Sequence, residues 1–136
     1  MNDLHLVVAL ADGRYAVPVA SVREVIRTGR LTPVPGAPPA VLGITNLRGE
    51  ILPVLDTGAL LGLRASASAG WTVIVEAAGQ RCGLGVSELF DVVSLPLGLE
   101  PSDSPALRGS ALLHGELLGV VDVVPLLDLV GSKASA

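Results

Sequence analysis

Few side chains in this sequence are suited to chemistry, and those that are lie far apart. His5 and His114 are the two histidines, and neither has cysteine, aspartate or glutamate clustered around it at the spacing of metal ligands. The single cysteine, Cys82, excludes an internal disulfide and fits a reducing compartment, and we interpret it as a small buried hydrophobic residue. These residues predict no metal site and no bound cofactor.

Motifs that support catalysis are also missing from the sequence. The segment GLGVS, residues 83–87, lacks the third glycine and the lysine of a phosphate-binding loop, and Ser87 lacks the flanking glycines of a nucleophile elbow. Asp56 and Asp122 each follow an apolar run and precede a helical turn, which is typical of aspartates that cap helices. We therefore predict no catalytic residue and no enzyme activity.

The most distinctive polar residues lie within residues 41–62, VLGITNLRGEILPVLDTGALLG. Two apolar runs, residues 41–45 and 51–55, flank a polar pentad with a glycine, which predicts a β-hairpin. Residues 57–62 predict one helical turn that a glycine stops. Arg48 lies at the tip of the hairpin, where it is either a solvated turn residue or a contact for a partner.

The elements on either side of this hairpin are short. Residues 4–11 and 14–19 predict a first hairpin around Asp12-Gly13. Val22, Val25 and Ile26 recur at helical spacing, so we expect a short helix over residues 20–26. Residues 27–39 are rich in proline and glycine and predict an extended loop.

The sequence contains a duplication with a shift of about 66 residues. LRGEILPVLD at residues 47–56 lies over LHGELLGVVD at residues 113–122, and the preceding elements recur in the same order. This pattern predicts one domain over residues 1–136, made of two similar β subdomains over residues 4–62 and 71–131, with a linker over residues 64–70. Each half has about 60 residues, too few for a robust core, so we expect the halves to pack on each other.

Composition limits the kinds of partner. The formal charge of -4 and a pI near 5.0 argue against nucleic acid, which needs a basic face. No window of about 18 residues is free of charge, proline or clustered glycine, and the N-terminus lacks the basic start of a secretory signal. We therefore expect a cytoplasmic protein that does not insert directly into a membrane.

The segment GITNLRGEILPVLD, residues 43–56, resembles the signature of the chemotaxis coupling protein CheW and of the related regulatory domain of the kinase CheA. The resemblance extends over nearly the whole chain. It implies an all-β fold of two SH3-like, five-stranded barrels side by side, with an apolar groove between them and short helical turns. Exchange of strands between the two halves is left open.

The resemblance also implies a function. A CheW-like protein is an adaptor that links the cytoplasmic tips of methyl-accepting chemoreceptors to the regulatory domain of a CheA-type histidine kinase. Glu24 beside two valines suits recognition of a helical partner, although an ordinary amphipathic turn explains it equally well. Matched positions predict that the binding residues are Val22, Glu24, Val25, Gly43, Asn46, Arg48, Val73, Cys82 and Leu89.

The chain departs from the family pattern in its second half. Residues 97–107 form a shorter loop than is typical, and we expect no extra helix at the C-terminal end. These departures allow an alternative function, a truncated CheW-like regulator that binds one partner and competes with the full coupling protein. A third interpretation is a generic SH3-like scaffold outside chemotaxis.

Overall fold

The computed structural model describes residues 2–10, 13–63, 69–96, 101–102 and 104–134. Within these residues the chain forms ten strands, two α-helices and one 3-10 turn. In chain order the elements are β1 (Asn2–Leu10), β2 (Gly13–Pro18), the 3-10 turn η1 (Val19–Ser21), β3 (Val22–Arg27), β4 (Val41–Leu47), β5 (Glu50–Asp56), α1 (Thr57–Leu60), β6 (Trp71–Ala77), β7 (Gln80–Val86), β8 (Glu88–Pro96), β9 (Leu107–Leu113), β10 (Glu116–Val121) and α2 (Val123–Ala134).

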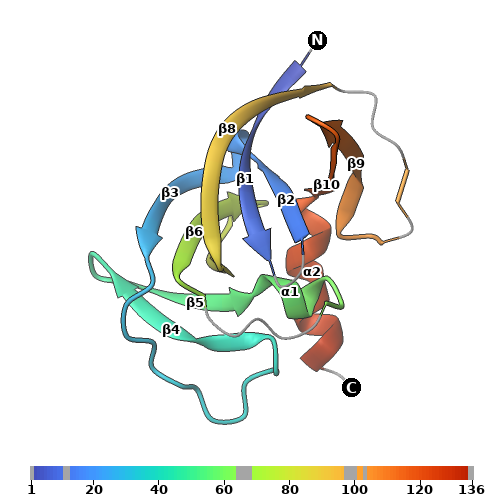
Figure 1. The fold of residues 1–136 in the computed structure, drawn as a ribbon. Helices are drawn as coiled ribbons and strands as arrows, with labels where there is room; N and C mark the ends of the chain where they lie inside the picture. The colour runs from blue at the N-terminus through green and yellow to red at the C-terminus, as the bar shows by residue number, and fades with distance from the viewer. Residues whose placement is uncertain (1, 11–12, 64–68, 97–100, 103, 135–136) are drawn as a thin grey trace.

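The strands form two five-stranded sheets (Figure 1). The first sheet has the order β8-β1-β2-β10-β9, and the second has the order β3-β6-β7-β5-β4. The prediction of an all-β fold with two five-stranded units is therefore confirmed.

Each sheet combines strands from both halves of the repeat. The first sheet joins β1 and β2 to β8, β9 and β10, whereas the second joins β6 and β7 to β3, β4 and β5. The exchange arises because β3 pairs with β6 and β8 pairs with β1, while parallel pairing joins β2 to β10 and β7 to β5. The boundaries 4–62 and 71–131 thus mark the repeat in the sequence, but the sheets do not follow them. Neither half holds all the strands of a sheet, which fits the small size of each half.

The main hydrophobic core lies between the two sheets and is built from both halves. It includes Leu6 and Val8 of β1, Val73 of β6, Leu84 of β7 and Leu126 of α2, all of them buried. A second cluster includes Val7, Ala16, Leu95, Leu118 and Val120, which all belong to the first sheet. Aliphatic residues fill both clusters, as the scarcity of aromatic residues requires.

The predicted local elements are partly confirmed. The hairpins β1–β2 and β4–β5 form as expected, and α1 follows Asp56, whose Oδ1 accepts a hydrogen bond from Ala59 N at 3.1 Å. The helix expected over residues 20–26 is wrong, because β3 takes these residues after η1 and places Val25 opposite Val73. Pairing with β6 outweighs helical spacing for a segment rich in β-branched residues.

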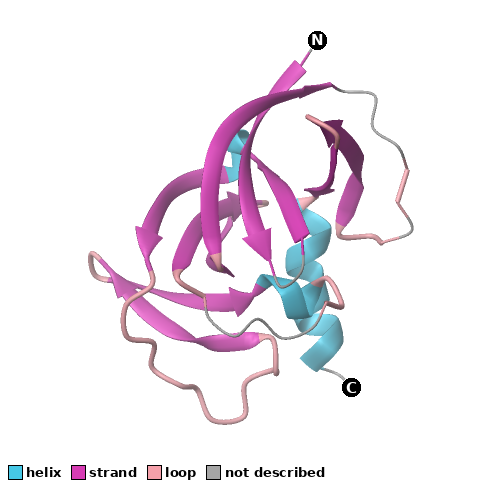
Figure 2. Ribbon diagram, in the orientation of Figure 1, coloured by secondary structure: helices cyan, strands magenta, loops and turns pink. Residues whose placement is uncertain are grey.

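The helical turn predicted after Asp122 is longer than expected, since α2 runs from Val123 to Ala134. Figure 2 shows α1 and α2 next to each other beside the sheets. Residues 64–68 of the predicted linker and residues 97–100 and 103 of the predicted short loop lie outside the described residues. Among the described residues, neither helix has the length and apolar character needed to cross a lipid bilayer.

Candidate functional site

Arg48 and Glu24 form an ion pair that joins the two edge strands of the second sheet. Arg48 lies in the tight turn after β4 with a positive φ of 50°, and Asn46 Oδ1 fixes this turn by accepting a hydrogen bond from Gly49 N at 2.8 Å. Arg48 Nη2 pairs with Glu24 Oε2, and Arg48 Nη1 lies 3.3 Å from Glu24 Oε1. Arg48 is therefore not a purely solvated turn residue, although its side chain is 69% exposed.

Four further charged side chains surround this pair and complete what we call the charged cluster. Arg23 Nε donates to Glu76 Oε2 at 2.7 Å, and Arg81 Nη1 donates to Glu50 Oε1 at 3.0 Å. Arg81 Nη2 lies 3.8 Å from Glu76 Oε1 and so links the two pairs. The cluster consists of Arg23, Arg48, Arg81, Glu24, Glu50 and Glu76.

The charged cluster is electrically balanced and hollowed. Its arginines equal its glutamates in number, and all except Glu76 line a cavity of about 430 Å³. The hydrogen bond from Arg23 holds the pKa of the Glu76 carboxyl below its ordinary value, against a smaller opposing effect of desolvation. A surface of this kind recognises a polar partner by matching its charges, and it contributes to specificity more than to affinity.

The remaining predicted binding residues do not all reach the surface. Val22 and Val25 of β3 are half-buried beside Glu24, whereas Val73, the register partner of Val25 on the neighbouring strand β6, is completely buried. Leu89 lies in β8 of the first sheet and packs against the main core. The nine predicted residues therefore fall in several places, and only Val22, Glu24, Val25, Asn46 and Arg48 lie in or beside the charged cluster.

Gly43 serves the chain itself. A Cβ at Gly43 would lie 2.9 Å from Thr32 O and 3.0 Å from Leu31 Cβ, so the absent side chain makes room for residues 31–32. Thr32 and Ile44 exchange two backbone hydrogen bonds of 2.9 Å there. Close approach of this internal loop, and not of a partner backbone, therefore explains the glycine at position 43.

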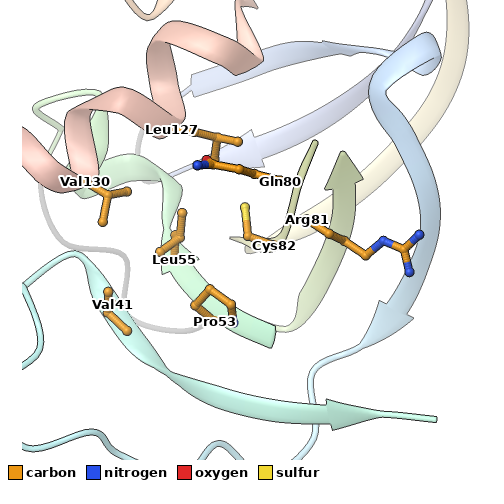
Figure 3. A pocket seen from close by; sticks show the side chains of 8 residues that line it. All are labelled: Val41, Pro53, Leu55, Gln80, Arg81, Cys82, Leu127 and Val130. Atoms are coloured by element: carbon orange, nitrogen blue, oxygen red, sulfur yellow. The ribbon is translucent and has the colours of Figure 1, made fainter. Parts of the chain in front are cut away.

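Cys82 lines an apolar cavity that shares Arg81 with the cavity of the charged cluster (Figure 3). The cavity has a volume of about 360 Å³ and lies between β4, β5 and β7 and the helix α2. Burial raises the pKa of the Cys82 thiol to about 11, so the side chain is a neutral thiol at physiological pH. The prediction that Cys82 is a small buried residue is confirmed, since 5% of it is exposed.

The histidines lie apart in the structure. His5 is buried in β1 with Nδ1 3.0 Å from Asp3 O, and His114 is exposed in the turn between β9 and β10. Across the described residues, no three histidine, cysteine, aspartate or glutamate side chains come together in a way that could hold a metal ion.

Sequence reasoning missed Arg23, Glu50, Glu76 and Arg81 of the charged cluster. The repeat contained a signal for two of them, because Arg81 and Glu50 correspond to Arg14 and Glu116 of the other sheet. Arg14 Nη1 and Glu116 Oε2 form an ion pair of 3.3 Å, equivalent to the pair between Arg81 and Glu50. An arginine and a glutamate at the same positions of both repeats therefore indicated an ion pair between strands from different halves.

The fold and the site together define a duplicated, strand-exchanged β protein with a charged surface at one sheet edge and an apolar cavity next to it. The CheW-like domain family matches residues 4–131, so the chain belongs to this family.

Similar proteins agree with this assignment. The chemotaxis protein CheW of Rhizobium meliloti is 30% identical over 124 residues, which is 84% of this chain and 80% of the relative. The chemotaxis protein CheW of Bacillus subtilis is 27% identical over 141 residues, which is 96% of this chain and 90% of the relative. The crystal structure of the scaffolding protein TtCheW from Thermoanaerobacter tengcongensis superimposes with a TM-score of 0.83 at 27% identity, covering 90% of this chain and 86% of that chain.

Proposed function

We propose that this chain is a non-enzymatic adaptor that couples methyl-accepting chemoreceptors to a CheA-type histidine kinase. Its membership of the CheW-like domain family and its similarity to two chemotaxis proteins support this role. The role requires no cofactor, and it places the chain in the cytoplasm, where it reaches receptor arrays through its partners.

The observation that carries the proposal is the chemical difference between two equivalent hairpin tips. The β4–β5 tip presents Arg48, paired with Glu24, beside the polar Asn46. The β9–β10 tip instead presents Leu112 and Leu117, which lie directly opposite each other and are 68% and 65% exposed. Exposed leucines at a hairpin tip are typical of a surface that a partner covers.

A coupling protein needs two binding surfaces of different character, and this duplicated fold offers one on each sheet. In this proposal Val22, Glu24, Val25, Asn46 and Arg48 contact one partner, and the exposed leucines of β9 and β10 contact the other. Val73, Gly43 and Leu89 support these surfaces from within. The alternative is a competitor that binds one partner only, and it predicts that one of these two surfaces has no partner.

Pairwise binding of variants tests the assignment of surfaces. Titration calorimetry measures binding of a receptor cytoplasmic fragment and, separately, of a CheA regulatory domain. R48A should lower the affinity for one of these partners at least tenfold. A double variant, L112S/L117S, should lower the affinity for the other partner by a similar factor. H114A changes the equivalent tip residue next to the leucines and should leave both affinities within about twofold. If R48A and L112S/L117S both lower the affinity for the same partner and leave the affinity for the second partner unchanged, the proposal of two separate surfaces is contradicted.

A further inference from the structure

The duplication gives the chain two equivalent cavities, one on each sheet, and each is lined in part by residues of the main core or residues packed against it. The Cys82 cavity is lined by Val41, Pro53, Leu55, Gln80, Arg81, Cys82, Leu127 and Val130. The Tyr15 cavity, of about 300 Å³, is lined by Gly13, Arg14, Tyr15, Leu107, Ser110, Leu117 and Gly119. Both lie where a strand of one half pairs in parallel with a strand of the other.

The register of these parallel strands makes Cys82 the equivalent of Tyr15. In the first sheet Val120 pairs with Ala16, and Gly119 with Tyr15. In the second sheet Val54 pairs with Gly83, so Pro53 and Cys82 occupy the places of Gly119 and Tyr15. Arg81 and Arg14, which precede Cys82 and Tyr15, each bind a glutamate at the start of the neighbouring hairpin strand, which confirms the equivalence.

An aromatic ring covers the neighbouring strand in one copy and is missing from the other. A Cβ at Gly119 would lie 2.7 Å from Tyr15 Cδ2 and 2.8 Å from Tyr15 Cε2, so the ring rests directly on that glycine. In the Cys82 cavity the short thiol leaves the surface over Pro53 open, and Leu127 and Val130 of α2 form the opposite wall (Figure 3). The fold therefore has a position for an aromatic ring that this chain does not fill in the second sheet.

We propose that the Cys82 cavity binds an aromatic side chain, phenylalanine or tyrosine, of a partner protein. Six of its eight lining residues are apolar or, in the case of Cys82, carry an uncharged thiol. An apolar cavity of about 150 Å³ is already large enough for benzene, and this one is larger, at about 360 Å³. A planar ring is the shape that the equivalent site in the same chain already accommodates.

The charges around the cavity favour a neutral ring over an anionic ligand. Arg81 is the one charged residue in the lining, and in Figure 3 its guanidinium extends away from Cys82, Pro53 and Leu55. That guanidinium is held by Glu50 and Glu76. Gln80 is the remaining polar residue, and its amide is suited to a phenol hydroxyl at the rim.

The position of the cavity points to a protein as the source of the ring. Arg81 lines both the Cys82 cavity and the cavity of the charged cluster, so the two are adjacent. A partner that contacts the charged cluster can insert a neighbouring aromatic side chain over Pro53. Buried aromatic anchors beside a polar rim are a common arrangement at interfaces. This step rests on the proposed adaptor function, whereas ring binding by the cavity does not.

The first test uses the isolated chain and p-cresol, which is the side chain of tyrosine. In ¹H–¹⁵N spectra, p-cresol should shift the amides of Val41, Cys82 and Leu127, and cyclohexanol, an aliphatic ring of similar size, should bind at least fivefold more weakly. The double variant C82Y/P53G recreates the pair Tyr15 and Gly119 and should abolish these shifts, whereas C82A leaves the cavity open and should keep them. Equal binding of the two probes, or shifts that persist in C82Y/P53G, would overturn the proposal.

Thermal unfolding of each variant shows whether it still folds. C82L is a second variant that blocks the cavity, and it leaves Pro53 unchanged. A second experiment adds saturating p-cresol to the receptor fragment and kinase-domain titrations. Weaker binding of one partner, by at least threefold, is the expected result, and unchanged binding of both would overturn a protein source for the ring. If p-cresol binds but the chain engages neither partner, the adaptor function fails while the ring-binding site stands.

Discussion

Arg48, at the tip of the β4–β5 hairpin, and Glu24, in β3, are ion-paired across the two edges of the second sheet. The two residues belong to strands at opposite ends of the order β3-β6-β7-β5-β4, so their contact closes the sheet on itself. The side chain of Arg48 is 69% exposed and that of Glu24 is 30% exposed, so a partner can reach the pair. The pair therefore both closes the second sheet and forms part of the surface that is proposed to bind a partner.

The exposed pair should matter more for binding than for folding. R48A and E24A should each lower the free energy of unfolding by less than about 1 kcal/mol, because solvent screens exposed pairs. Urea denaturation of both single variants and the double variant measures the coupling between them. A coupling well above that value would show that the pair is a structural brace, and would weaken its assignment to partner binding.

Gly43 should be intolerant of a side chain in the free protein. G43A places a Cβ against the backbone of Thr32 and should destabilise the fold by about 1 to 3 kcal/mol. G29A is the matched control, since a Cβ there meets no atom within 4 Å, and it should change stability by less than about 0.5 kcal/mol. Equal unfolding midpoints for the two variants would contradict the internal role of Gly43.

The buried thiol of Cys82 should make stability fall at alkaline pH. Its folded pKa of about 11 lies above the ordinary value of 9.0, so the folded state holds the proton more tightly than the unfolded state. The resulting stabilisation is complete below pH 9 and disappears as pH rises through 11, with a maximum of about 2 to 3 kcal/mol.

Chemical denaturation at pH 8 and pH 11 of the wild type and of C82A measures this contribution. The wild type should lose more stability over that interval than C82A, which has no thiol to ionise. The thiol of the folded protein should also react slowly with a disulfide reagent at pH 8. Identical pH dependence in the two proteins would show that the thiol is not buried in solution.

Strand exchange makes neither half self-sufficient. A fragment of residues 1–63 lacks β6 and β7, which join β3 to β5 in the second sheet, and the fragment of residues 69–136 lacks the equivalent strands β1 and β2. We expect each fragment alone to have a poorly dispersed ¹H–¹⁵N spectrum and an equimolar mixture to recover the spectrum of the intact chain. A well-dispersed spectrum from either fragment alone would contradict this account.

The sequence predicted the fold well because the repeat and the hairpin signals agree with each other. The hairpins around residues 12–13 and 48–49 and the turn after Asp56 were expected from local patterns, and the two five-stranded units were expected from the family resemblance. The exchange of strands was left open, since apolar alternation indicates which residues are buried but not which strands pair with each other. For the same reason β3 looked helical, because Val22, Val25 and Ile26 fit both periodicities over so short a segment.

The candidate site was less accessible to sequence reasoning. Arg48 stood out by its position in a turn, but its contact with Glu24 depends on closure of the sheet, which brings together residues 24 positions apart. The cavity beside Cys82 was hidden because only a helical turn was expected after Asp122, and Leu127 and Val130 of the longer helix α2 form one wall of it. The register of the parallel strands shows that Cys82 and Tyr15 occupy equivalent positions.

The most direct measurement is a three-component pull-down with purified chain, an immobilised receptor cytoplasmic fragment and a CheA regulatory domain. The account predicts that the receptor fragment retains the kinase domain when this chain is present and does not retain it when the chain is omitted. R48A and L112S/L117S should each reduce that retention, and H114A should not. Retention of this chain with the kinase domain left in solution would contradict the coupling function.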